Sequence, residues 1–170
     1  MDTASIYKDF DITAARMGKK GVLLVTGKGN PMTIGWGQLG NVWGKPVFTV
    51  LVRHSRFSHE AMEQTGEFSV NVLPESLDNV IGICGSKSGR DTDKISACNL
   101  NLQKSDFISV PHLAEAEIIY ECKTIYKDEM LSNALPLEIE SRFYPRNEKF
   151  PEGDYHTIYV AEVLNVLNRL

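Results

Sequence analysis

The chain has 170 residues, of which 42% are hydrophobic and 24% are charged, a composition typical of a folded domain rather than of a disordered chain. Its net charge of −4 excludes a global basic field, so we expect no nucleic-acid partner and only a local anion site. The sequence contains no repeats and no linker rich in Pro, Gly or Ser, and we therefore predict a single domain over residues 1–170.

The cysteines and the apolar segments indicate the environment of the protein. Cys84, Cys98 and Cys122 are odd in number and lack metal-ligand spacing, which argues against a disulfide framework and a structural zinc site. We expect buried free thiols. The apolar segments are too short to span a bilayer, and the N-terminus has no basic stretch followed by an apolar run. These features predict no membrane partner and a reducing, cytoplasmic location.

The first half of the chain predicts a hairpin followed by a third strand. "GVLLVT" (21–26) is rich in β-branched residues, "GKGNP" is a turn, and "MTIGWGQL" (32–39) continues as a strand. Gly35 and Gly37 lie in that strand, where glycine often marks the close approach of another backbone or a ligand. "KPVFTVLVR" (45–53) is apolar on both faces, which favours a strand inside a barrel or between layers.

Three short helices are predicted next. "SHEAMEQTG" (58–66) has Ser58 as a candidate N-cap, Glu60 in its first turn and Gly66 at its end. The segment 76–85 places an apolar stripe on one face, formed by Leu77, Val80, Ile81 and Cys84. A third, shorter helix begins near Asp91.

The second half of the chain returns to strands. "AEAEIIYECKTIYKD" (114–128) alternates apolar and charged residues and predicts a half-buried strand. "LPLEIESRFY" (135–144) repeats that alternation, and "HTIYVAEVLNVL" (156–167) supplies a closing strand. Many strands with a few short helices between them predict a mainly β protein, an antiparallel barrel with helical excursions.

A cluster of anion-binding groups lies between the third strand and the first helix. In "RHSRFS" (53–58), Arg53 and Arg56 offer forked donors, Ser55 and Ser58 offer hydroxyls, and the helix start offers free N–H groups. Together they describe a phosphate cradle. The alternative is that the arginines are solvated and Ser58 is only a cap.

A second polar stretch is "CGSKSGRDTDK" (84–94). Its glycines let backbone amides approach an anion, and Lys87, Arg90 and Lys94 add positive charge. The alternative is a solvated loop in which Asp91 caps the next helix.

Taken in order, "NPMTIGWG", "WGKPVFTVLVRHSRFSHEAMEQTGEFSVNVLPE", "CGSKSGRDTDK" and "DYHTIYVAEV" closely resemble the flavin reductase-like, FMN-binding split-barrel family, and within it the flavoredoxin group. The resemblance covers residues 15 to 167. It implies a six-stranded antiparallel Greek-key split β-barrel with short helices, a homodimer, and FMN bound non-covalently near the subunit interface.

The resemblance also implies roles for individual residues. The turn and strand with Asn30, Pro31, Met32, Thr33 and Trp36 would run along the isoalloxazine, where glycines and backbone amides can meet the ring. The stretch with Arg53, Ser55, Arg56 and Ser58 would hold the phosphate. Lys94 would reach the polar tail or the ring edge of the flavin.

Because flavin supplies the redox chemistry, no catalytic triad is needed and none is assigned. The resemblance implies an oxidoreductase or electron-transfer protein that moves electrons between NADH, NADPH or a protein donor and an acceptor. A non-enzymatic module that binds flavin or haem is the alternative. His156 either faces the flavin or a bound nicotinamide, or is a structural histidine at a strand end.

Three further expectations concern the remaining polar and aromatic residues. His54, His59 and His112 are scattered in the sequence, so no metal site is predicted. Trp43 is assigned to packing or to the dimer interface. The segment from 128 to 155 has loop character and is a candidate substrate entrance.

Overall fold

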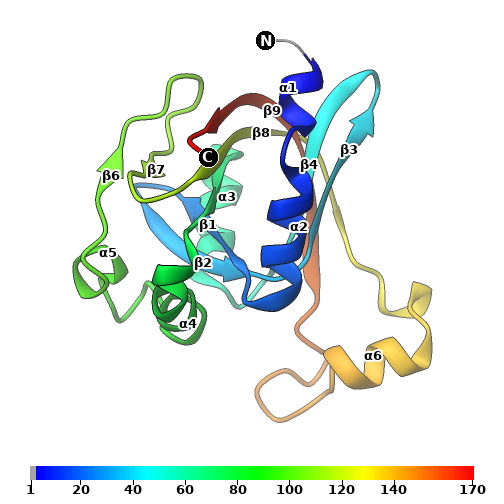
Figure 1. The fold of residues 1–170 in the computed structure, drawn as a ribbon. Helices are drawn as coiled ribbons and strands as arrows, with labels where there is room; N and C mark the ends of the chain where they lie inside the picture. Colours follow the sequence, from blue (N-terminus) through cyan, green and yellow to red (C-terminus); the bar gives the residue numbers. More distant parts are fainter. Residues whose placement is uncertain (1–2) are drawn as a thin grey trace.

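The protein is built around one antiparallel sheet, with short helices at its margins (Figure 1). The structure is a computed structural model that describes residues 3–170. The strands of the sheet are β1 Val22–Thr26, β2 Asn30–Ile34, β3 Gly37–Val42, β4 Lys45–Arg53, β5 Glu67–Val72, β8 Ile118–Glu129 and β9 His156–Asn168. A separate small ladder pairs β6 Leu102–Gln103 with β7 His112–Leu113.

The sheet has seven strands rather than the six expected, in the order β2-β1-β5-β8-β9-β4-β3. The run 32–39 is divided into β2 and β3 at Gly35 and Trp36, and these two strands form the opposite edges of the sheet. They do not pair with each other within residues 3–170, so the sheet does not close into a barrel. The strand predicted over 156–167 is confirmed as β9, although it lies between β8 and β4 rather than at an edge.

The helices are short, and most of them lie between two strands along the chain. They are α1 Thr3–Tyr7, α2 Phe10–Lys19, α3 Phe57–Thr65, α4 Asp78–Ser86, α5 Lys94–Ala97 and α6 Leu137–Phe143, with 3₁₀ turns η1 Glu75–Leu77 and η2 Ser132–Ala134. The helices predicted over 58–66 and 76–85 correspond to α3 and α4. No element is predicted from the sequence over 3–20, where α1 and α2 lie, or over 67–72, where β5 lies.

Helix α2 contacts both β1 and β3, and so lies against strands from both halves of the sheet. Thr13 Oγ1 shares a hydrogen bond of 3.0 Å with Tyr120 Oη, and Arg16 donates to the carbonyl of Leu73. Thr13 is fully buried. This N-terminal helix is therefore packed into the fold by specific contacts.

Two predicted helix caps are wrong. Arg56 occupies the N-cap position of α3 with no side-chain cap bond, while the Ser58 hydroxyl accepts a hydrogen bond from Asn30 Nδ2 at 2.9 Å. Asp93, not Asp91, caps α5, since its side chain accepts from the backbone N–H groups of Ile95 and Ser96. Each predicted cap lies two residues from the actual helix boundary.

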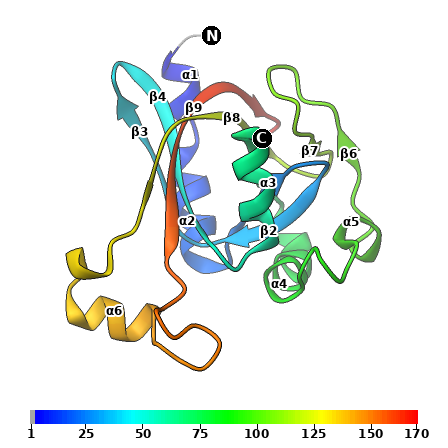
Figure 2. The same cartoon turned by 180° about the vertical axis from the view of Figure 1, so that it is seen from behind.

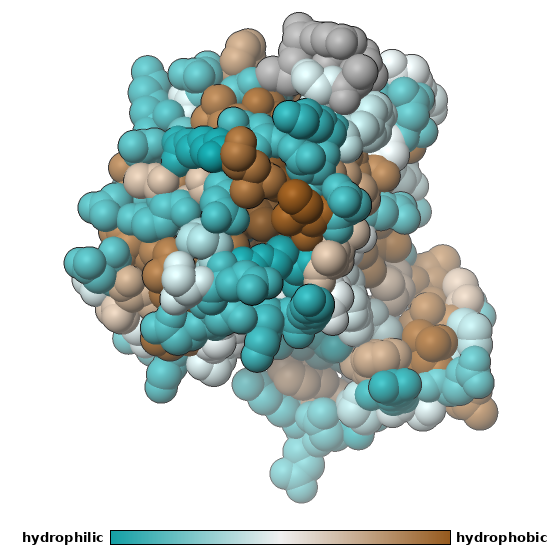
Figure 3. Space-filling model, viewed as in Figure 1, coloured by the Kyte–Doolittle hydropathy of each residue, from teal (hydrophilic) through white to brown (hydrophobic). Residues whose placement is uncertain are grey.

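The predicted strand over 135–144 is also wrong, because α6 occupies Leu137–Phe143. This helix belongs to an excursion between β8 and β9, residues 130–155, which we call the arm. Figures 1 and 2 show the arm projecting away from the sheet. Leu131, Leu137 and Ile139 of the arm are exposed, and an apolar patch is visible there in Figure 3.

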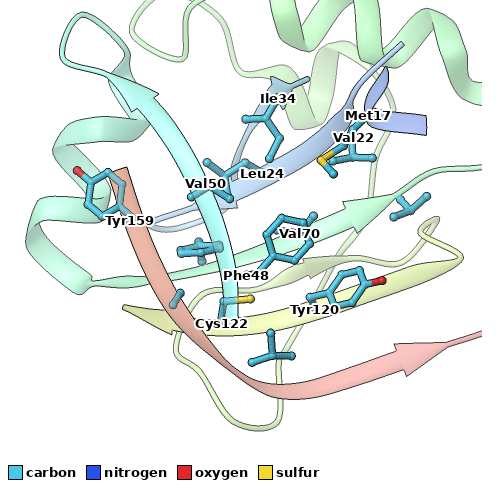
Figure 4. Close-up of a cluster of buried hydrophobic side chains, with 14 of the residues drawn as sticks. Met17, Val22, Leu24, Ile34, Phe48, Val50, Val70, Tyr120, Cys122 and Tyr159 are labelled. Atoms are coloured by element: carbon cyan, nitrogen blue, oxygen red, sulfur yellow. The ribbon is translucent and has the colours of Figure 1, made fainter. Parts of the chain in front are cut away.

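Most of the core lies on the concave side of the sheet. Phe48, Val50, Val70 and Tyr120 are fully buried there, and Figure 4 shows their side chains converging from different strands. A second cluster lies on the other face, beneath α4 and the segment 100–116, and contains Leu23, Val80, Ile81, Cys84 and Ile119. Because both faces are covered, several strands are apolar throughout.

The strand predicted over 114–128 is buried more deeply than its alternation suggests. Glu121, one of the charged residues of this alternation, is fully buried. Its carboxylate accepts hydrogen bonds from the backbone N–H groups of Asp106 and Phe107. A buried charge requires such partners, and here the loop between β6 and β7 supplies them.

Candidate functional site

A cavity of about 490 Å³ lies where β2, the end of β4, α3 and the segment after α4 meet. This volume is within the range of cofactor sites. Nine of the ten predicted cofactor-binding residues line it: Asn30, Met32, Thr33, Trp36, Arg53, Ser55, Arg56, Ser58 and Lys94. His156 lines it as well. Pro31 is buried and borders a neighbouring cavity instead.

Strand β2 forms one wall, and its polar side chains are held by the adjacent helices. Asn30 donates to Ser58 Oγ on α3, and Thr33 Oγ1 donates to the carbonyl of Ile81 on α4 at 2.6 Å. Since β2 is an edge strand, its outer backbone groups have no strand partner within residues 3–170. Such groups are available to hydrogen-bond a planar ligand.

The two glycines after β2 serve different purposes. Gly35 lines the cavity, and a Cβ added there would meet only the carbonyl oxygen of Met17, at 3.5 Å. A Cβ at Gly37 would lie 3.0 Å from the carbonyl oxygen of Thr49 and 3.1 Å from the Phe48 ring. The close approach at Gly37 is thus to the protein's own β4.

Arg53 and Ser55 join the sheet to the arm. The guanidinium of Arg53 donates to the carbonyls of Asp154, at 2.6 Å, and of Phe143, at 2.8 Å. Ser55 donates from its hydroxyl and its backbone N–H to the carboxylate of Asp154. Although both residues border the cavity, these side-chain donors are hydrogen-bonded to the arm.

Arg56 has a different environment. Its side chain is exposed and borders the cavity, and its guanidinium forms no hydrogen bond or ion pair within residues 3–170. It precedes the first turn of α3, which has no side-chain cap. A guanidinium beside the uncapped N–H groups of a helix is a suitable place for an anion.

The segment after α4 forms the opposite wall. Gly89 packs so closely that an added Cβ would clash with the Asn30 and Phe57 side chains. Arg90 donates to the carbonyl of Ser55 and pairs with Glu60. Lys87 also borders the cavity and has no ion pair within the described residues, so its charge remains available.

Lys94 and Cys84 are the two buried residues of this wall. Lys94 is 3% exposed, and its Nζ lies 3.5 Å from the carbonyl oxygen of Cys84. Burial lowers the pKa of the Lys94 ammonium. Burial also raises the pKa of the Cys84 thiol to about 12, so this thiol stays protonated at neutral pH. All three cysteines are free, but only Cys84 and Cys122 are buried as expected, whereas Cys98 is partly exposed.

Aromatic side chains close the end of the cavity next to the arm. The Trp36 ring lies 5.1 Å from that of Phe143 and 5.4 Å from that of His156, measured between centroids. Tyr144 shares a hydrogen bond of 2.8 Å with His156 Nδ1. Burial, followed by the charge of Arg53, lowers the pKa of His156 to about 4. His156 is therefore neutral at pH 7.

The lining is strongly basic even though the chain is acidic. Six cationic residues border the cavity, namely Arg53, Arg56, Lys87, Arg90, Lys94 and Lys149. Asp91 is the one carboxylate among the lining residues. Neither Lys149 nor Asp154 is among the predicted site residues. Only the loop character of the segment 128–155 indicated that part of the chain.

Within residues 3–170, no helix is long and apolar enough to cross a membrane, and no group of three or more His, Cys, Asp or Glu is arranged to hold a metal ion. His54 and His59 are separated in the sequence, but their rings are neighbours, with centroids 5.1 Å apart.

Comparisons with known proteins agree with this fold. A flavoredoxin from Methanosarcina acetivorans superposes with a TM-score of 0.68 at 21% identity, over 88% of this chain and 68% of that one. An FMN-binding protein from Thermus thermophilus gives 0.66 at 20% identity, over 88% and 70%. An uncharacterized protein from Archaeoglobus fulgidus is 28% identical over 146 residues, which cover 85% of this chain and 69% of the relative. Residues 16–169 match the family described as "Flavin reductase like domain", and the chain belongs to that family.

Proposed function

We propose that the protein is an FMN-binding oxidoreductase of the flavin reductase or flavoredoxin type, which moves electrons between NADH, NADPH or a protein donor and an acceptor. The observation that carries this proposal is the basic cavity, which joins an edge strand for a planar ring to an uncapped helix for a phosphate. When bound, FMN supplies the redox chemistry. The protein's residues bind and orient it.

The ring is assigned to the wall formed by β2. Met32, Thr33, Gly35 and Trp36 border the cavity there, and the unpaired backbone of an edge strand suits the alternating donors and acceptors of an isoalloxazine. Asn30 and Thr33 are held by hydrogen bonds to Ser58 and Ile81, so this wall is ordered before the ligand arrives. Such preorganisation reduces the entropic cost of binding.

The phosphate is assigned to Arg56 and the first turn of α3, with Lys87 from the opposite wall. This narrows the cradle predicted over 53–58, because Arg53 and Ser55 are hydrogen-bonded to the arm. Ser58 acts through Asn30 rather than as a direct ligand. Lys94, buried at the cavity wall, is assigned to the polar tail or the ring edge.

The oligomeric state and the partners are the next part of the proposal. We propose a homodimer, supported by the exposed aromatic residues Trp43 and Tyr126, which are 69% and 46% exposed and lie 6.2 Å apart. We further propose that the protein works in the cytoplasm with a small-molecule or protein acceptor. Sedimentation velocity at micromolar concentration tests the dimer, and a single monomeric species would contradict it.

The decisive experiment is the anaerobic visible spectrum of the protein with stoichiometric FMN, before and after addition of NADH and then NADPH. A perturbed flavin spectrum that bleaches within seconds supports a reductase and identifies its donor. A perturbed spectrum that does not bleach favours a carrier reduced by another protein, or a non-enzymatic binding module. An unperturbed spectrum would contradict FMN binding.

A further inference from the structure

The arm contributes to the cavity by holding one of its lining residues. Tyr144, the residue after α6, is 3% exposed, and His156, the first residue of β9, is 6% exposed. Their side chains share one hydrogen bond, 2.8 Å from Tyr144 Oη to His156 Nδ1, and their rings meet edge to face at 5.5 Å. His156 also borders the cavity.

Several contacts fix Tyr144 in this position. The guanidinium of Arg53 lies 4.9 Å from the centre of its ring, and on the arm Tyr155 stacks against it at 4.9 Å with an interplanar angle of 20°. Tyr155 in turn donates to the carboxylate of Glu140 on α6 at 2.7 Å. The Tyr144 hydroxyl is thereby held at the histidine by contacts from both the sheet and the arm.

The direction of the Tyr144–His156 hydrogen bond follows from burial. The Tyr144 hydroxyl has no other hydrogen-bond partner within residues 3–170, and a buried O–H without an acceptor is costly. The phenol must therefore donate, and Nδ1 must accept. A neutral imidazole that accepts at Nδ1 carries its proton on Nε2, which is the nitrogen left for the cavity.

We propose that Tyr144 is a positioning residue that holds His156 as the Nε2–H tautomer, so that the cavity presents a neutral hydrogen-bond donor beside Trp36. The group it recognises must be an acceptor, such as a carbonyl oxygen on a planar ring. That this ring belongs to flavin or to a redox partner rests on the proposed function. The tautomer itself does not.

Burial first, and then the surrounding charges, keep His156 in its neutral form. Arg53 and Arg56 disfavour a second positive charge, as does His54, whereas the carboxylate of Asp154 alone favours it. With burial added, the pKa of His156 falls to about 4. The Nε2–H donor therefore belongs to a neutral imidazole throughout the pH range 6–9, and the ring becomes positively charged only in acid.

The first test is the ¹⁵N spectrum of the histidine side chains in the flavin-free protein between pH 6 and 8. His156→Gln assigns the signal, since the chain has 4 histidines. We expect a proton on Nε2 and a bare Nδ1 at His156. A proton on Nδ1 in the unmodified protein would overturn the inference, whatever the variants do and whether or not FMN binds.

The second test compares Tyr144→Phe with Tyr155→Phe. The first removes the hydroxyl that reaches His156, while the second removes a neighbouring hydroxyl whose hydrogen bonds, among the described residues, are to Glu140 and Ser132 and not to His156. In Tyr144→Phe we expect a mixture of tautomers and a higher His156 pKa, because the neutral form loses its hydrogen-bond partner. We also expect roughly 2- to 12-fold weaker binding of FMN. Tyr155→Phe should leave the tautomer unchanged.

The readouts of the second test separate this inference from the proposed function. An unchanged tautomer and pKa in folded Tyr144→Phe would overturn the positioning role. Absence of FMN binding in the unmodified protein would instead overturn the proposed function while leaving the tautomer result valid. Should Tyr144→Phe fail to fold, the spectrum of the unmodified protein still decides the tautomer.

Discussion

Arg53 and Arg56 are separated by two residues, yet their guanidinium groups have different environments. Arg53 is hydrogen-bonded to the carbonyls of Phe143 and Asp154, whereas Arg56 is exposed at the cavity with no partner within residues 3–170. The two arginines therefore form a matched pair of test positions, because each alanine substitution removes the same charge at nearly the same place.

Arg56→Ala is expected to weaken FMN binding by about 1.5 to 3 kcal/mol, the range for a lost hydrogen bond to a charged group. Riboflavin, which lacks the phosphate, should lose much less. Fluorescence titration of both ligands measures the difference. Equal weakening of the two would contradict the phosphate assignment.

Arg53→Ala is expected to act on the arm instead. Loss of two hydrogen bonds to arm carbonyls should increase amide hydrogen exchange in residues 130–155 by at least tenfold. The ratio of FMN to riboflavin affinity should stay close to that of the unmodified protein. Loss of that ratio without faster exchange would show that Arg53, not Arg56, holds the phosphate.

The arm shows what alternation of apolar and polar residues can and cannot predict. Alternation correctly predicted a strand over 114–128, which contains most of β8. It failed at 135–144, where Leu137 and Ile139 alternate with glutamates but are exposed. Pro136 at the N-cap, acidic Glu138 and Glu140 in the first turn, and Arg142 in the last turn are helix signals that outweigh the pattern.

Other features of the structure had no readable signal in the sequence. Which of two nearby arginines binds the arm depends on the position of Asp154, about a hundred residues away. The buried state of Glu121 depends on a loop that crosses β8. The residues around the cavity were grouped by motif, but their partners come from long-range contacts that local periodicity does not encode.

At the scale of the arm itself, residues 145–153 can be replaced by a short Gly/Ser turn. This removes Lys149 from the cavity wall but keeps Tyr144, Asp154 and His156. We expect flavin reduction kinetics to change more than FMN affinity, as measured by anaerobic stopped flow and by titration. Lys149→Ala separates loss of charge from loss of the loop, and unchanged kinetics would exclude the arm as the entrance.

For the whole molecule, stability depends on the core on the concave side of the sheet. Phe48 is fully buried and packs edge-on against Phe10 and Tyr120. Phe48→Ala should lower the free energy of unfolding by about 3 to 5 kcal/mol, measured by urea denaturation. Phe107→Ala, at a site that is 60% exposed, is the control and should stay within about 0.5 kcal/mol. Similar losses at both sites would contradict this core.

The position of β9 between β8 and β4 also constrains the order in which the protein can form during synthesis. Before β9 is made, the remaining strands of the main sheet form two unconnected pieces: β2-β1-β5-β8 and the β3–β4 hairpin. The cavity takes one wall from β2 and another from the end of β4, so neither piece contains it. Although domains can begin to fold while the ribosome is still translating, this cavity can form only after residues 156–168 have been added. A nascent chain stalled earlier would display β4 and β8 as open edges, and unpaired strand edges favour aggregation.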